Sequence, residues 1–237
     1  DIRPCLVEDW EISDDGLVYT FYLRKGVKFH DGTDFNAEDV IASFDYLKED
    51  QPSNFTSIQS YEATDDFTVV VTMNQPYPYF INLLGSLYFK ILSAEALEEY
   101  GDTDIRCAVG TGPYYIESYN TGDKVVTKAY QDYWDQEAIP YIETVNYNII
   151  TDNNTAFLAL QGGDVDFMLF NSALQYQTAQ ANSALQTFEV INSCNWILGL
   201  NTNVEPLDKL EVRQAIDCFL DKDAINMAGF DGLGFPT

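Results

Sequence analysis

The first pattern along the chain is an alternation of apolar and polar positions that predicts short strands. Residues 17–23, LVYTFYL, are β-branched and aromatic, and they follow Asp15-Gly16, a common hairpin turn. Val27 to Phe29 predict a second short strand, which ends at another turn, Asp31-Gly32. The chain therefore starts with hairpins.

After this turn the apolar spacing changes to that of a helix. Asn36 is the expected N-cap, and Glu38 and Asp39 occupy the first turn, where the positive end of the helix dipole favours acidic side chains. The apolar face of this helix is formed by four residues at helical spacing, Val40, Ile41, Phe44 and Leu47.

The remainder of the chain predicts strands and helices in alternation. Further strands are expected at 58–63, 67–73, 114–119, 124–130, 143–150, 165–169, 186–191 and 195–200. Further helices are expected near 79–85, 94–100, 153–161, 172–181, 209–219 and 222–228. Hairpins followed by this alternation predict a mixed α+β or α/β chain rather than a pure sandwich.

Composition narrows the class of protein. The 237 residues suffice for one large domain or two small ones, and an apolar fraction of 46% is that of a globular protein. With 38 acids against 12 bases, the net charge of −26 repels phosphate backbones and anionic membrane surfaces, so we expect no nucleic-acid partner. The sequence contains no run of about 20 apolar residues that predicts a membrane span.

The ends and the cysteines add two expectations. The start, DIRPCLVEDWEIS, and the end, AGFDGLGFPT, indicate a fragment excised from a longer protein, and no signal peptide is visible. The four cysteines, Cys5, Cys107, Cys194 and Cys218, form no CxxC pair, which argues against a zinc cluster. Their spacing is compatible with one or two disulfides and equally with buried free thiols.

The candidate for chemistry is the stretch RKGVKFHDGTDFNAEDV, which contains His30, the single histidine. No GxSxG elbow accompanies His30, and Asp31 and Asp34 lie in a turn too close to it to form a good metal cage. The sequence also lacks GxxxxGK[ST] and GxGxxG, and 38 acids make any single carboxylate pair uninformative. The residues alone favour a binding module over an enzyme, with no catalytic residue, metal or cofactor.

Five segments in order resemble the extracellular solute-binding proteins of peptide- and nickel-type ABC transporters, family 5. They are LVEDWEISDDGLVYTFYLRKGVKFHDGTDFNAEDVIASF, VVVTMNQPYPYFINLL, GTGPYYIESYNTGDKVV with QDYW, ALQGGDVDF, and NTNVEPLDKLEVRQAIDCFLDKDAI. This resemblance implies a periplasmic-binding-protein-like fold of type II. Residues 1–11 and 112–193 would form the first lobe, 12–111 an inserted α+β domain, and 194–237 the beginning of a truncated second lobe.

The resemblance also implies a function and a site. The protein would capture oligopeptides or a similar solute outside the membrane by lobe closure, as a periplasmic protein or cell-surface lipoprotein, and would deliver it to ABC transporter permease subunits. Its membrane contact would be a lipid anchor absent from this chain. The residues expected to face the ligand, near strand ends and the lobe crossover, are Tyr88, Phe170, Asn171, Asn195 and Trp196.

Two alternatives stay open at this point. The same fold could bind nickel, haem or another chelate, which predicts histidine or arginine in the cleft. A carboxylate-dependent glycoside hydrolase, from another class, predicts two acids facing each other across a cleft. His30 itself is expected to belong to the turn before the helix and to have no catalytic or metal-binding role.

Overall fold

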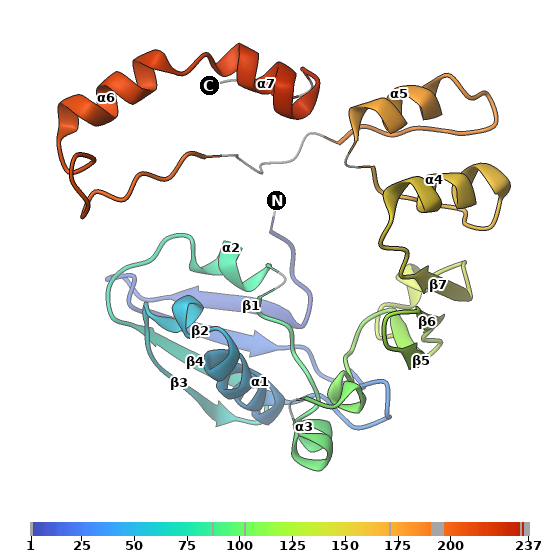
Figure 1. Cartoon of the computed structure of the whole chain (residues 1–237). Helices are drawn as coiled ribbons and strands as arrows, with labels where there is room; N and C mark the ends of the chain where they lie inside the picture. Colours follow the sequence, from blue (N-terminus) through green and yellow to red (C-terminus); the bar gives the residue numbers. More distant parts are fainter. Residues whose placement is uncertain are drawn as a thin grey trace. The chain divides into compact units, whose positions relative to one another are not determined.

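The computed structural model describes residues 2–86, 88–101, 103–170, 172–190, 197–232 and 234. It divides into two compact units, Asp1–Ile149 and Ile150–Thr237, which are described separately (Figure 1). The first unit holds two sheets and three helices, and the second holds four helices within the described residues. The mixed α/β class expected from the sequence is confirmed.

The larger sheet of the first unit has four antiparallel strands in the order β1-β2-β4-β3. Its strands are β1 (Val7–Ile12), β2 (Val18–Leu23), β3 (Ile58–Asp65) and β4 (Thr68–Met73). Tyr19 pairs with Val71 and Phe21 with Val69, and these four side chains are buried on one face. The period-2 pattern of 17–23 and 67–73 therefore marks the buried face correctly.

One helix covers that buried face. Helix α1 (Ala37–Asp50) begins at Asn36 as expected, with a capping box in which Asn36 and Asp39 bond reciprocally to each other's backbone. The predicted apolar residues Val40, Phe44 and Leu47 are buried in the core. A 3-10 turn, η1 (Pro52–Phe55), follows and contributes Phe55 to the same core.

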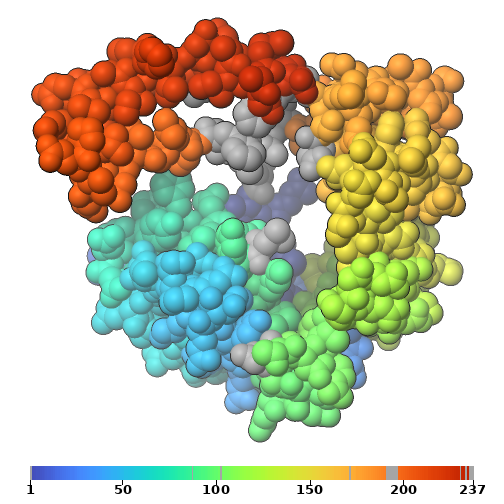
Figure 2. Space-filling view, in the orientation of Figure 1, coloured from blue at the N-terminus to red at the C-terminus, as the bar shows by residue number. Residues whose placement is uncertain are grey.

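Two shorter helices complete this part of the unit. Helix α2 (Phe80–Leu84) buries Phe80, whose ring lies 5.0 Å from that of Tyr19 in an edge-on arrangement. Helix α3 (Ala94–Tyr100) has Ser93 as its N-cap and ends at Gly101. A 3-10 turn, η2 (Ile105–Cys107), follows it along the chain. Figure 2 shows the atoms of α3 beside those of α1, in agreement with the hydrogen bond from the N–H of Ala94 to Asp39 that joins the two helices.

The smaller sheet of the first unit has three antiparallel strands in the order β5-β6-β7. They are β5 (Tyr114–Asn120), β6 (Lys124–Ala129) and β7 (Thr144–Asn148), with a 3-10 turn, η3 (Gln136–Ala138), before the last. The β5–β6 hairpin turns at Gly122, whose φ of 73° is one that glycine adopts without strain.

In the described residues of the second unit there are four helices and no strand. They are α4 (Asn153–Gly162), α5 (Ala173–Gln180), α6 (Leu210–Phe219) and α7 (Lys222–Phe230). Asp152, Ser172 and Asp221 cap three of them at the N-terminus, and Gly163 ends α4 in the left-handed conformation. Gln175 of α5 donates to the carbonyl of Asn153, which ties the first turns of α5 and α4 together.

Several predicted strands do not form. Val27 and Phe29 are fully buried, but the chain around them makes only an isolated bridge between Lys28 and Asp34. Residues 165–169, 186–190 and 197–200 are irregular, while 191 and 195–196 of the same predictions lie outside the described residues. The physical reason is that a segment of high β-propensity forms a strand only when a neighbouring strand accepts and donates its backbone hydrogen bonds. Among the described residues, no strand lies beside these segments.

Candidate ligand-binding site

Tyr88 lies in the loop between α2 and α3 of the first unit. Its side chain is 52% exposed, and its backbone N–H donates to Oγ of Ser86 over 3.3 Å. The next residue, Phe89, is buried. Tyr88 and Phe89 follow one another in a turn, where Phe89 faces the core and the ring of Tyr88 faces solvent. This exposure is what a ligand-contacting ring requires before the ligand arrives.

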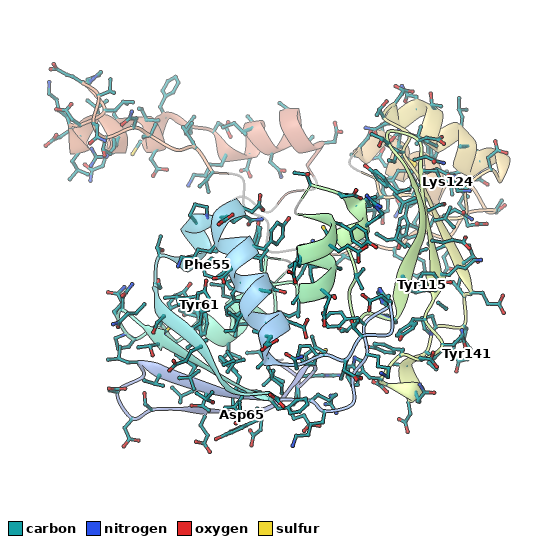
Figure 3. The ribbon with its side chains drawn as sticks, turned by 90° about the horizontal axis from the view of Figure 1, so that it is seen from below. Phe55, Tyr61, Asp65, Tyr115, Lys124 and Tyr141 are labelled. Atoms are coloured by element: carbon teal, nitrogen blue, oxygen red, sulfur yellow. The ribbon has the colours of Figure 1, made fainter. Side chains whose placement is uncertain are left out.

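Phe89 belongs to a cluster of aromatic rings that holds the loop onto α1. Its ring centre lies 5.5 Å from that of Phe44 and 5.2 Å from that of Phe55. Tyr61 of β3 completes the cluster at 5.4 Å from Phe44 (Figure 3, where Phe55 and Tyr61 are labelled beside α1). Phe44 meets Phe89 and Tyr61 edge-on, and such aromatic pairs add to the free energy of apolar burial, so the cluster fixes the position of the loop.

The far end of the loop is fixed by two buried polar side chains of α1, which the sequence analysis did not single out for this role. Ser43 receives a hydrogen bond from the N–H of Leu92 over 2.9 Å and donates to its carbonyl oxygen over 3.2 Å. Asp39 accepts from the N–H of Ala94 over 2.9 Å and from that of Asn36 over 2.8 Å. Their i, i+4 spacing on one helix face was the available signal.

The ionisation of Asp39 reflects this position. Burial raises the pKa of its carboxyl group, while the hydrogen bonds from the N–H groups of Ala94 and Asn36 lower it. Both oxygens are therefore engaged with the backbone, and the group serves to hold a helix start and a loop together.

Phe170 lies in the second unit, at the end of the segment that was expected to be a strand. Its half-buried ring packs edge-on against the buried Phe157 of α4, with ring centres 5.6 Å apart. It precedes Ser172, the N-cap of α5, by two residues. The position beside Phe157 supports a structural contribution of Phe170, whatever its part in binding.

The other predicted site residues cannot be placed. Asn171, Asn195 and Trp196 lie outside the described residues. Tyr88 and Phe170 belong to different units, so each is described only within its own unit. The ligand-facing roles of the five residues therefore stay predictions.

His30 forms part of a junction between the turn after β2 and the start of the smaller sheet. Its Nε2 lies 2.9 Å from the carbonyl oxygen of Gly112, and its Nδ1 receives a longer hydrogen bond, 3.4 Å, from the N–H of Gly110. A neutral imidazole with its proton on Nε2 satisfies both contacts. Burial lowers the pKa of His30, against smaller raising effects from the bond to Gly112 and the charge of Asp31.

The described residues show no metal-binding constellation. Within them, no group of three or more His, Cys, Asp or Glu side chains is placed to hold a metal ion. Among the cysteines, Cys5 and Cys218 are exposed and Cys107 is buried, whereas Cys194 lies outside the described residues. Across that same part of the chain, no helix is both long and apolar enough to cross a membrane.

Comparison with known families gives a match over the whole chain. The family described as bacterial extracellular solute-binding proteins, family 5 Middle, matches residues 1–237. The glutathione-binding protein GsiB of Salmonella choleraesuis is 34% identical over 246 aligned residues, which cover 100% of this chain and 47% of that protein. The chain thus spans about half the length of the curated relatives it matches.

Solved structures agree with this result. The ABC transporter-associated periplasmic binding protein DppA of Helicobacter pylori, in complex with the peptide STSA, superposes with a TM-score of 0.76 and 28% identity. That match covers 98% of this chain and 50% of DppA. NikZ of Campylobacter jejuni, in complex with Ni(L-His), matches with a TM-score of 0.72, 28% identity, and coverage of 98% and 48%. The expected fold, that of periplasmic binding proteins, is confirmed.

Proposed function

The chain belongs to the bacterial extracellular solute-binding proteins of family 5, and from this membership we propose that it is part of the substrate-binding component of an ABC importer. Its solute would be an oligopeptide or a similar small molecule, captured outside the membrane by lobe closure and without catalysis. The observation that carries the proposal is the family match over residues 1–237, joined to the similarity to DppA with its bound peptide.

An enzymatic function is set aside. The family and the matched relatives are solute-binding proteins rather than enzymes. The alternative of a carboxylate-dependent glycoside hydrolase therefore loses its support, and no residue of this chain is given a catalytic role.

The division of the chain between lobes is part of the proposal. Residues 1–11 and 112–193 would belong to the first lobe, 12–111 to an inserted domain, and 194–237 to the second lobe. Residues 7–12 form β1 and pair with β2. This pairing supports counting β1 with the inserted domain and moving the first boundary toward the N-terminus.

Five residues are proposed to contact the solute. Tyr88 and Trp196 would provide aromatic walls with a polar edge, and Phe170 an apolar one. The amides of Asn171 and Asn195 would each donate to and accept from the main chain of an extended peptide. The exposure of Tyr88, in a loop that is anchored to α1 through Phe89, Leu92 and Ala94, supports its part in this set.

The partners follow from the same proposal. Besides the solute, they would be the permease subunits of the importer, and the protein would work in the periplasm or at the cell surface, with or without a lipid anchor outside this chain. A net charge of −26 suits a partner other than nucleic acid.

A metal chelate is the second candidate solute. The similarity to NikZ with its bound Ni(L-His) favours it. The single histidine counts against direct ligation of a metal by this chain, because both ring nitrogens of His30 already bond to Gly110 and Gly112. A chelate would have to bring its own ligands, as the Ni(L-His) of NikZ does.

One experiment separates the candidates. The intact protein that contains this chain is purified under native conditions, and its co-purified solute is identified by native mass spectrometry and then by calorimetry with dipeptides, tetrapeptides, glutathione and Ni(L-His). Binding of peptides or glutathione supports the proposal. Binding of the metal chelate alone overturns the peptide assignment, and catalytic turnover of any added compound overturns the proposed function.

A further inference from the structure

We propose that His30 is an acid-sensitive clamp between the four-stranded and the three-stranded sheets of the first unit, and that protonation of its ring opens this junction. This inference is independent of which solute the protein binds. It rests on the hydrogen bonds around one imidazole and on the segments that those bonds join.

The first part of the clamp is a set of hydrogen bonds between His30 and the segment 110–112. The backbone N–H of His30 donates to the carbonyl oxygen of Gly110 over 3.0 Å, and the N–H of Gly110 donates in return to Nδ1 of the ring. Nε2 and the carbonyl of Gly112 form the third bond. Main chain and side chain of His30 therefore make three hydrogen bonds to two residues, Gly110 and Gly112, of the segment that leads into β5.

The second part is aromatic. Tyr130, directly after β6, places its ring edge-on to His30 with centres 5.1 Å apart, and its hydroxyl donates to the carbonyl of Phe29 over 2.9 Å. The N–H of Tyr130 donates to the carbonyl of Pro113 over 2.8 Å. The ring of Tyr115 of β5 has its centre 6.2 Å from that of His30. The half-buried imidazole, in the segment after β2, is thus flanked by two tyrosines of the three-stranded sheet and its connection.

Protonation is incompatible with one of these bonds. Adding a proton from solvent to Nδ1 places an N–H where the lone pair accepted from the N–H of Gly110, and two donors then face each other. The hydrogen bond from the N–H of Gly110 to Nδ1 is lost, while the bond from the N–H of His30 to the carbonyl of Gly110 and the Nε2 bond to Gly112 do not depend on Nδ1.

The charged and titratable groups around the ring are few. Asp31 lies on the same turn and favours the protonated ring, and Tyr115 and Tyr130 face it from β5 and from the end of β6. Lys28 and Asp132 act on the hydroxyl of Tyr130. Gly110 and Gly112 contribute dipoles without charge. Burial outweighs the attraction of Asp31, so the pKa of His30 is lowered.

The sign of the pH effect follows from this direction. Because the folded chain holds His30 with a pKa below its ordinary value of 6.5, the open or unfolded chain takes up the proton first as pH falls. The contribution to stability is fully present above 6.5 and is lost as pH falls through the lower pKa of the folded state. The junction should therefore be closed at neutral pH and loosen in mild acid.

The test compares the intact protein with two variants between pH 7.5 and 5.5. Carbon-13 labelled histidine gives a ring signal, identified by its loss in His30→Gln, and hydrogen exchange is followed in the peptide that contains residues 108–113. We expect the ring to titrate below 6.5 and the exchange of this peptide, corrected for its intrinsic rate, to rise at least about twofold. His30→Gln, which donates and accepts without titrating, should remove that rise.

Asp31→Asn keeps the experiment decisive if the glutamine variant does not fold. An asparagine can still accept the hydrogen bonds that Asp31 receives from Thr33, but it carries no charge. The titration of His30 should then move to still lower pH. A ring that titrates at or above 6.5 in the folded protein, or exchange at 108–113 that is independent of pH in the wild type, overturns the proposal.

Discussion

The backbone N–H of Ala94 donates a hydrogen bond to Oδ1 of Asp39 over 2.9 Å, although 55 positions separate the two residues in the sequence. The same carboxylate closes the capping box of α1 through the N–H of Asn36. One buried side chain therefore secures a helix start and the end of the loop that carries Tyr88.

Replacing Asp39 tests this double role. Asp39→Ala leaves two part-buried backbone N–H groups, those of Asn36 and Ala94, without their acceptor, and should lower the free energy of unfolding by about 2 to 4 kcal/mol. Glu38→Ala is the matched control, because Glu38 occupies the same helix turn but is exposed, and it should cost at most about 1 kcal/mol. Urea denaturation of both variants measures the difference. Equal effects would show that Asp39 acts only through the helix dipole.

The aromatic cluster predicts a contrast between neighbours. Phe89→Ala removes a buried ring that packs on Phe44 and Phe55, and should destabilise the protein by about 3 to 5 kcal/mol. Tyr88→Ala, one position away, should change the unfolding free energy by less than about 0.5 kcal/mol because its ring is exposed. Thermal denaturation reports both, and a large cost for Tyr88→Ala would assign its ring to the core.

Solute affinity, unlike stability, should depend on Tyr88. In the intact protein Tyr88→Ala should weaken solute binding about tenfold or more, because it removes an aromatic wall, and leave stability unchanged. Tyr79→Ala is the control, since Tyr79 is 70% exposed and lies outside the predicted site. Isothermal titration with the identified solute compares the two. Unchanged affinity in Tyr88→Ala would remove this residue from the site.

Arg24 predicts a distinction between two basic residues. Its guanidinium lies 4.5 Å from the ring centre of Trp134, bonds to Glu8 and donates through Nε to the carbonyl of Cys5. Arg24→Lys keeps the charge but loses the planar stack and the Nε bond, and should cost about 1 to 2 kcal/mol. Lys25→Arg should stay within about 0.5 kcal/mol in the same urea experiment. Similar losses in both variants would mean that charge alone matters.

For Asp104 we predict a pH effect that arises from hydrogen bonds to a neighbouring charge, whereas that of His30 arises from burial. Its hydrogen bonds with Arg106 lower the pKa of Asp104 to about 2. Arg106→Gln should raise that pKa toward its ordinary value of 3.8, as measured by carbon-13 NMR of the carboxyl group. Because the folded pKa is depressed, the stabilising contribution is present above 3.8 and disappears as pH falls through about 2. An unchanged pKa in Arg106→Gln would show that backbone hydrogen bonds dominate.

Elements with local signals were predicted well. The helix that begins at Asn36 starts where a capping side chain meets an apolar face, and it appears with the predicted cap. The hairpin of β5 and β6 follows from its glycine-containing turn. Such features depend on residues within a few positions of one another, so one sequence is enough to find them.

Features that depend on distant partners were predicted poorly. β1 was missed because the acid-rich VEDWEI, an edge strand, buries little surface of its own. The segment 165–169 was expected to be a strand on its apolar composition, yet no described strand lies beside it. The binding residues were chosen by resemblance. The local sequence around Asn171, for example, is equally compatible with a ligand contact and with a residue at the start of a helix. The loop anchors Asp39 and Ser43 were hidden for the same reason, because their partners lie near residue 93.

The attachment of the loop between α2 and α3 also bears on the thermodynamics of capture. Phe89 fixes the loop next to Tyr88, and the bonds from Asp39 and Ser43 fix residues 92–94, so the loop is anchored on the C-terminal side of that ring before any solute arrives. The conformational entropy of this part of the loop is then lost when the protein folds and not when the solute binds. A solute that touches Tyr88 meets a surface already in place, and its affinity would carry little entropic penalty from this side of the site.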